Sequence, residues 1–302
     1  MVRRTENKLS NISNRRADLT QNQSRLRRYA GKALRTLLVL IFWLAVWLLI
    51  YRLVNRDLVF ASPGQVIRRL AELAATREFW RATLDSLARI GLGFVIGLAA
   101  GIVLAIATAA SKWFNTLFKP LLGMIRATPV SSFIILALIW MSNVRVVVFI
   151  VFLMVMPIIW ANLHEGINKT DRQLLEMGKL FRFGRYKMIR WIYLPSLSPF
   201  LVSAVTTGLG LGWKAGIAAE VLSTPSSSLG KALYDSKIYL ETADLFAYTA
   251  VVIIVSMVLE KIIIKGLASL QTLAGRHEKL FDWNAKHLLS KRSMYRGKNG
   301  DE

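Results

Sequence analysis

Six apolar stretches, each close to the length of a membrane-spanning helix, constrain this chain more than any other feature. A helix needs about 20 apolar residues to cross a hydrocarbon core about 30 Å thick. The stretches cover residues 33–53, 90–110, 127–144, 146–163, 194–221 and 245–264. With 54% hydrophobic residues and a mean hydropathy of +0.42, the chain is too apolar for an ordinary soluble domain. We therefore predict an all-α, polytopic membrane protein with about six transmembrane helices.

The first stretch is either a signal peptide or a retained span. The polar tail before it is too long for an ordinary signal peptide, and no clear small-residue cleavage site follows it. We predict an uncleaved span, with Arg35 and Arg52 reaching towards water at its ends. The chain then divides into a basic tail (1–32), a transmembrane domain (33–266) and a second basic tail (267–302).

The net charge of +22 comes mainly from segments outside the apolar stretches. Because Lys and Arg accumulate on cytoplasmic segments, this pattern favours a membrane protein over a nucleic-acid-binding protein. We predict that both tails and the basic loop 162–195 are cytoplasmic, in a multi-pass protein of the cell (inner) membrane. One segment opposes this orientation, because arginines lie between the first two stretches at positions 52, 56, 68, 69, 77 and 81. We place it outside, because acidic residues are interspersed and the N-terminal tail is more strongly charged.

Two of the stretches carry glycines spaced four residues apart, on one helix face. They are Gly93, Gly97 and Gly101 in one stretch, and Gly208, Gly212 and Gly216 in the other. Such glycines let helix backbones approach closely in lipid. Two interpretations stay open: packing of helices within one subunit, and a dimer contact or sliding surface used in gating.

The loop 162–195 contains a short amphipathic helix. Its apolar residues recur at helical spacing, at Leu174, Leu175, Met177, Leu180 and Phe181. Thr170 or Asp171 is predicted to cap its N-terminus. The helix is predicted to lie on the cytoplasmic side, against the membrane or another protein, and periodicity does not decide between these two.

The same loop resembles the signature of the binding-protein-dependent ABC transporter permeases. That signature reads Glu-Ala-Ala, three residues, Gly, nine residues, Ile-x-Leu-Pro. The matching residues, at the correct spacing, are Glu176, Ile192, Leu194 and Pro195. Met177 and Gly178 replace the two alanines, and Arg182 stands at the position of the family's glycine. We expect Gly184, two residues later, to supply the turn instead.

Further matches to the family follow in order from about Ser62 onward. They are Ser62-Pro63, Ser86-Leu-Ala-Arg-Ile-Gly-Leu-Gly-Phe, Pro120 with Arg126-Ala-Thr-Pro129, and Trp213-Lys-Ala-Gly-Ile-Ala-Ala-Glu220. The combination resembles the branch that imports nitrate, taurine and aliphatic sulfonates.

The resemblance implies a type I ABC importer permease that works as a homodimer. It implies a cytoplasmic ATPase, which uses ATP and Mg²⁺, and an extracytoplasmic solute-binding protein that delivers the solute. It also implies that the short helix is a coupling helix seated in a groove of the ATPase. The residues implied in coupling are Leu174, Leu175, Glu176, Met177, Gly178, Phe181, Gly184, Ile192, Leu194 and Pro195.

Two charged residues, Lys214 and Glu220, lie within the fifth stretch. A charge at the bilayer centre costs about 2.5–3.5 kcal/mol, so it usually faces a partner or an aqueous path. We expect Glu220 near the outer surface, and we assign Trp213, Lys214 and Glu220 to the translocation path. For Lys214 two interpretations stay open: a path residue that favours an anion, and a structural pair with an acid on another span.

Residues for catalysis or metal binding do not form a recognisable pattern. There is no Gly-x-x-x-x-Gly-Lys-Ser/Thr run and no cysteine, and the three histidines are scattered. We predict a transporter subunit, not an enzyme, without a cofactor or metal of its own. Its expected solute is small and anionic, such as nitrate, taurine or an aliphatic sulfonate. The alternatives are a permease for a thiamine-precursor pyrimidine and a secondary transporter that needs no ATPase.

Overall fold

The computed structural model describes residues 34–56 and 58–267. The predicted tail 1–32, and all but the first residue of the tail 267–302, lie outside the described residues. The described residues are almost entirely helical, which confirms the all-α prediction. Five of their helices are long and apolar enough to cross a membrane, or six when the bent pair α4–α5 is counted as one span.

The chain divides into two compact units at residues 69 and 70. The first unit contains the helix Leu34–Val54, which agrees with the predicted first span. From within this helix, the Trp47 indole donates a hydrogen bond to the carbonyl of Ala61, which follows the helix, at 3.1 Å. Ser62 and Gln65 then form a reciprocal capping box, with bonds of 2.8 and 3.2 Å, at the start of α2 (Pro63–Ala74).

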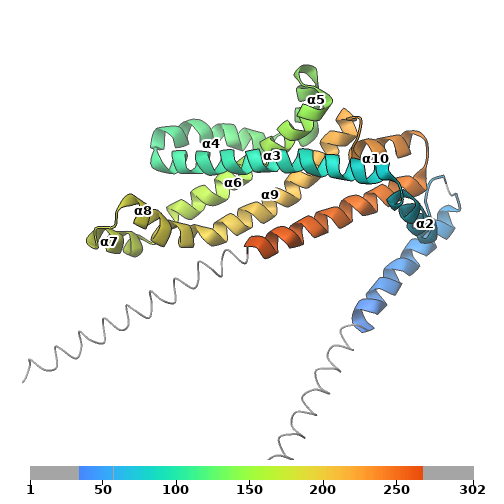
Figure 1. Cartoon of the computed structure of the whole chain (residues 1–302), viewed down its shortest axis with the longest axis horizontal. Helices are drawn as coiled ribbons and strands as arrows, with labels where there is room; N and C mark the ends of the chain where they lie inside the picture. Colours follow the sequence, from blue (N-terminus) through green and yellow to red (C-terminus); the bar gives the residue numbers. More distant parts are fainter. Residues whose placement is uncertain (1–33, 57, 268–302) are drawn as a thin grey trace, which may run out of the picture. The chain divides into compact units, whose positions relative to one another are not determined.

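Three long helices form the core of the second unit: α3 (Arg77–Ala110), α6 (Asn143–Asn168) and α9 (Leu194–Ser223). α6 packs against both of the others (Figure 1), and buried residues occur along it from Val146 to Gly166. The sixth predicted stretch is the helix Thr242–Leu267. α3 begins well before predicted residue 90, because Thr76 caps it by accepting a hydrogen bond from Phe79 N at 3.4 Å.

The two glycine stripes bring α3 and α9 close to α6. A Cβ added at Gly101 of α3 would lie 2.7 Å from the Cβ of Ile159. A Cβ added at Gly212 of α9 would lie 2.8 Å from Val155 Cγ2. These distances are shorter than a carbon–carbon contact allows, so the stripes serve packing within one subunit, the first of the two predicted interpretations.

The third predicted stretch, 127–144, is not one continuous helix, and here the prediction is wrong. α4 (Lys112–Ala127) and α5 (Val130–Trp140) meet at a bend of 102°. Proline disfavours helical backbone at the residue before it, and Thr128 before Pro129 is extended, with ψ 134°. The 11 residues of α5 rise about 16 Å, roughly half of a hydrocarbon core.

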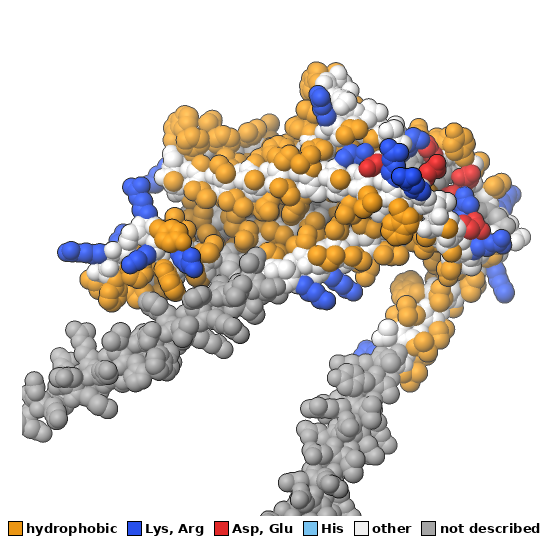
Figure 2. Space-filling model, viewed as in Figure 1, with side chains coloured by type: hydrophobic (Ala, Val, Ile, Leu, Met, Phe, Trp, Pro, Cys, Tyr) orange, Lys and Arg blue, Asp and Glu red, His pale blue; other side chains and the backbone are white. Residues whose placement is uncertain are grey.

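The two ends of the second unit carry different short helices. α7 (Arg172–Leu180), α8 (Arg185–Met188) and the π-helix η1 (Ile189–Tyr193) lie at one end, and α10 (Leu229–Ile238) lies at the other (Figure 1). Hydrophobic side chains cover the bundle between them, and charged side chains gather mainly towards the ends (Figure 2). This distribution is the one expected of a bundle that spans a membrane.

Candidate functional site

Residues 171–195 form a helical elbow that joins α6 to α9. Its first helix, α7, begins after Asp171, whose carboxylate accepts a hydrogen bond from Gln173 N at 2.8 Å. Thr170, the other predicted cap, instead donates its hydroxyl to the Gly166 carbonyl at 3.1 Å. The predicted amphipathic helix is therefore present, with Asp171 as its N-cap.

The turn after α7 is made by Arg182, and the expectation that Gly184 makes it is wrong. Arg182 has φ 51°, in the left-handed region, whereas Gly184 has φ −64° and caps α8. Arg182 N donates to the Lys179 carbonyl at 3.0 Å, and Phe183 N donates to the Gly178 carbonyl at 2.8 Å. This pair of bonds is a Schellman motif, whose left-handed position favours glycine. The turn thus explains why the related signature has glycine where this chain has Arg182.

Gly178 and Ile192, both singled out from the signature, pack against each other. A Cβ added at Gly178 would lie 2.8 Å from Ile192 Cδ1 and 2.9 Å from Met188 Sδ. Ile192 is buried, with 3% of its surface exposed. The small residue at position 178 therefore lets α7 lie directly on η1, so that the elbow is one packed body.

Pro195 stands two residues after η1, at the start of α9. It cannot donate a hydrogen bond to the carbonyl four residues earlier, and its ring crowds that carbonyl. The wide π turn of η1 directly precedes it and accommodates the ring. Ser196 beside it donates its hydroxyl to the Ile192 carbonyl at 2.7 Å, so the elbow continues into α9 without a loop.

The outer surface of the elbow is apolar and basic. Its exposed apolar side chains include Leu174, Leu180, Phe181, Tyr186, Ile189 and Trp191. Its basic residues are Arg172, Lys179, Arg182, Arg185, Lys187 and Arg190, against only Asp171 and Glu176. Glu176 and Leu194 are also exposed, whereas Leu175 and Met177 are half-buried. A basic surface with exposed apolar side chains is suited to contact with another protein.

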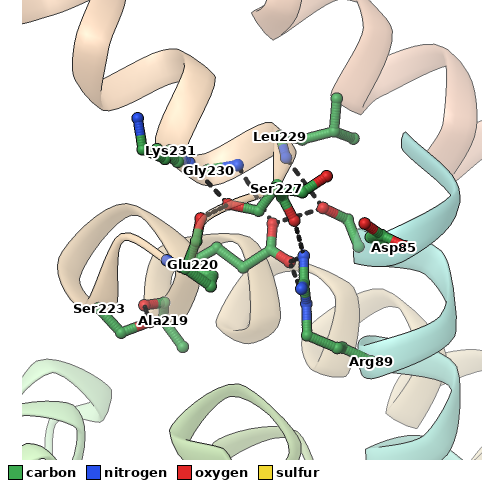
Figure 3. A network of polar contacts seen from close by, with 12 residues as sticks. Asp85, Arg89, Ala219, Glu220, Ser223, Ser227, Leu229, Gly230 and Lys231 are labelled. Carbon is green, nitrogen blue, oxygen red and sulfur yellow. Dashed lines mark hydrogen bonds and ion pairs between the residues drawn. The ribbon is translucent and has the colours of Figure 1, made fainter. Parts of the chain in front are cut away.

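At the opposite end, Glu220 of α9 is fully buried and lies among donors from two other helices, α3 and α10 (Figure 3). Its Oε1 accepts from Arg89 Nε at 3.2 Å, and its Oε2 accepts from Ser86 Oγ at 2.7 Å and from Gly230 N at 3.1 Å. Arg89 also donates to the Ser227 carbonyl. We call these five residues the Glu220 cluster. It joins α3 and α9 to the N-terminal end of α10, where backbone N–H groups favour a carboxylate.

The sequence around Glu220 makes this close approach possible. Thr224, at the end of α9, has φ 43°, and the chain then turns back towards α10. Gly230 lies so near that an added Cβ would be 2.3 Å from Glu220 Cβ and 2.6 Å from Val221 N. Any larger residue at position 230 would displace α10 from α9.

The three residues assigned to the path point in different directions. Trp213 is buried, and its indole donates to the Val252 carbonyl at 3.2 Å. Glu220 is enclosed within the cluster and held by Arg89 at 3.1 Å. Only Lys214 is exposed, and among the described residues it forms no ion pair. The interpretation of Lys214 as one half of a structural pair requires an acid on another span. Among the described residues, no acid forms such a pair with Lys214.

Sequence reasoning missed the roles of Ser86, Arg89 and Gly230. Ser86 and Arg89 belong to a motif noted above for its family resemblance, but nothing in it showed which acid they meet. The Glu220–Arg89 pair could have been suspected from charge alone. An acid within a span needs a partner, and Arg89 is the basic residue nearest to the second stretch.

Long apolar helices with a projecting basic elbow define a multi-pass membrane protein. The chain belongs to the family described as binding-protein-dependent transport system inner membrane component, whose sequence pattern matches residues 97–268. The predicted family is thereby confirmed.

The relatives support the predicted branch. The chain is 26% identical over 207 residues to the permease protein SsuC of Bacillus subtilis strain 168, whose name refers to aliphatic sulfonates, with 68% of this chain and 74% of SsuC covered. It is 25% identical over 253 residues to the taurine transport system permease protein TauC of Escherichia coli K12, with 82% and 89% covered. A crystal structure of an amino acid ABC transporter shares the fold, with a TM-score of 0.53, 15% identity, and coverage of 67% of this chain and 97% of that one.

Proposed function

We propose that this chain is the membrane subunit of an ATP-driven importer and receives its driving force through the elbow. The observation that carries the proposal is the packed elbow itself, whose apolar and basic surface is exposed and which continues directly into α9. A docking element needs this combination of a free surface and a rigid connection to the spans. The exposed Leu174, Leu180 and Phe181 would enter a groove of a cytoplasmic ATPase, which would bind and hydrolyse ATP with Mg²⁺.

α9 would transmit the movement of the elbow across the membrane. It has 30 residues and is therefore about 45 Å long, enough to cross the hydrocarbon core. At its far end it is tied to α3 and α10 by the Glu220 cluster. A displacement of the elbow would therefore reach α10 with little loss, because helices and packed cores resist compression.

The basic elbow would face the cytoplasm, together with both termini, and the α10 end would face outwards. This orientation follows from the excess of Lys and Arg at the elbow, whereas acidic residues are frequent around α10. Two copies of the chain would enclose the path, and a solute-binding protein would deliver the solute at the α10 end.

The transported solute would be a small anion, with a sulfonate as the leading candidate. Both relatives compared above have names that refer to sulfonic acids, and the exposed Lys214 lies at membrane depth. Uptake of taurine, an aliphatic sulfonate, nitrate and a pyrimidine into proteoliposomes would rank the candidates. ATP-independent uptake by the permease alone would support the secondary-transporter alternative and contradict the proposal.

The coupling role is tested by an F181D variant. Phe181 is 66% exposed, so the change mainly removes exposed apolar area and adds an acid; within the chain it removes a ring contact with Phe183, whose centroid is 6.4 Å away. We expect co-purification with the P-loop ATPase expressed beside it to fall at least tenfold. L240D, an exposed leucine at the opposite end, is the matched control and should leave co-purification unchanged. Equal co-purification of F181D and wild type would show that the elbow is not the docking element.

A further inference from the structure

Three polar residues of α9 lie on one exposed face of the helix. Ser203, Thr207 and Lys214 are all exposed. At about 100° per residue, the three positions fall within about 40° of one another around the helix. We call them the polar stripe. The opposite face of α9 carries Gly212 and Gly216, which pack inside the subunit, so the stripe faces away from the core.

The polar groups of the stripe have no partners among the described residues. Two other serines of α9 are bonded within the helix, since Ser196 donates to the Ile192 carbonyl at 2.7 Å and Ser223 to the Ala219 carbonyl at 2.6 Å. Ser203 and Thr207 form no such bond in the described part of the chain. Unpaired polar groups are costly in hydrocarbon, so the stripe needs a polar environment.

The charge along this face is positive and unbalanced. The nearest acid of α9, Glu220, is enclosed and neutralised by Arg89 at 3.1 Å, so it does not offset Lys214. An ammonium with hydroxyl groups on the same side matches an oxygen-bearing anion, whose oxygens accept hydrogen bonds from each of these groups in turn. A cation would be repelled by Lys214, and an apolar solute would leave three donors unpaired.

We infer that the polar stripe binds the transported oxyanion at successive positions along the path. The inference rests on the proposed function, because the stripe faces water only if the permease encloses a path. Lys214 lies about 10 Å along the helix from Thr207, and Thr207 about 6 Å from Ser203. A sulfonate or similar small oxyanion would contact Lys214 first and then move to the hydroxyls of Thr207 and Ser203. The second copy would present the same stripe from the facing side.

The absence of cysteine in the natural sequence allows a direct test by labelling of single introduced cysteines. S203C and T207C variants of the full chain are treated in membranes with an anionic, sulfonate-bearing thiol reagent or with its trimethylammonium analogue. I253C is the matched control, since Ile253 is exposed on the apolar face of another spanning helix. We expect both stripe variants to react with the water-soluble reagents and I253C to react only with a lipid-soluble maleimide.

Lys214 should set the charge preference. We expect the anionic reagent to react with T207C at least fivefold faster than the cationic one, given partial screening by salt over about 10 Å, and with S203C, about 16 Å from Lys214, by a smaller margin. K214M should bring this ratio to about one, and K214R should retain it. Size-exclusion chromatography in detergent checks that each variant is folded, with K214Q as a second neutral variant.

Three results would overturn the inference. They are labelling of the stripe by lipid-soluble reagents only, protection of the stripe from every reagent, and a charge preference that does not depend on Lys214. The labelling measurements do not depend on ATP hydrolysis. If the proposed function is wrong, the wild-type protein will not associate with the ATPase. The two failures are therefore distinguishable.

Discussion

Replacement of Arg89 by methionine is expected to destabilise the protein strongly. The change leaves the Glu220 carboxylate, which is 0% exposed, with hydrogen bonds from Ser86 and Gly230 only. Removing one partner of a buried ion pair costs about 3–5 kcal/mol, because the remaining charge is buried without compensation. Arg89 is itself 13% exposed, so we expect a value near the lower limit, about 3 kcal/mol.

A double variant separates the ion pair from general packing. In R89M/E220Q the glutamine oxygen still accepts from Ser86 and Gly230, and no buried charge remains unpaired. We expect this variant to be more stable than R89M alone by about 1–2 kcal/mol, since the effects of substitutions at two residues in contact do not simply add. R81M is the matched control on the same helix, because Arg81 is 77% exposed and 3.9 Å from Asp85. It should change stability by less than about 0.5 kcal/mol.

The measurement is thermal unfolding of the detergent-purified protein, followed by the fluorescence of its nine tryptophans. For 302 residues the entropy of unfolding is about 0.6 kcal/mol/K, so about 3 kcal/mol corresponds to a fall in Tm of about 5 °C. An R89M variant that melts no lower than R81M would refute the reasoning. A double variant less stable than R89M would show that the carboxylate needs no counter-charge.

Two further predictions concern helix packing and the elbow. G101L should prevent α3 from packing on α6, because even an added Cβ would lie 2.7 Å from Ile159 Cβ. At Gly91 nothing lies within 4 Å of an added Cβ, so G91L should express and should elute like the wild type in size-exclusion chromatography. R182V should lower stability by about 1–2 kcal/mol in the same melting assay, because a β-branched side chain resists φ 51°, whereas R182G should not lower it. Equal elution of G101L and G91L, or equal melting temperatures of R182V and R182G, would contradict the structural explanation.

Much of the fold follows from local sequence. The first, fourth, fifth and sixth spans agree with the helices closely, because an uninterrupted apolar run is itself the property that a bilayer selects. The amphipathic helix in the basic loop was also predictable, together with its cap, since Asp171 acts on a backbone N–H two residues away. The third span failed because α5 ends at Trp140 after 11 residues, and hydropathy does not show that the apolar run 127–144 is interrupted at residues 141 and 142.

The candidate site was only partly predictable. The signature located the elbow and drew attention to Gly178, Ile192 and Pro195. It did not show that Arg182 would take the left-handed conformation, because glycine is the usual residue there. For the path, a charge within a span marked both Lys214 and Glu220, but the sequence did not distinguish the exposed ammonium from the buried carboxylate.

The sequence by itself determined where the chain is apolar, where it is basic and which short segment forms the elbow, since each property depends on residues close together in the chain. Only the tertiary structure decided that both glycine stripes face α6, that Glu220 meets an arginine 131 positions away, and that Ser203, Thr207 and Lys214 are left without partners. The physical reason is that partners distant in the sequence are selected by how helices pack. Burial and pairing are therefore properties of the assembled bundle, whereas hydropathy belongs to the residues themselves.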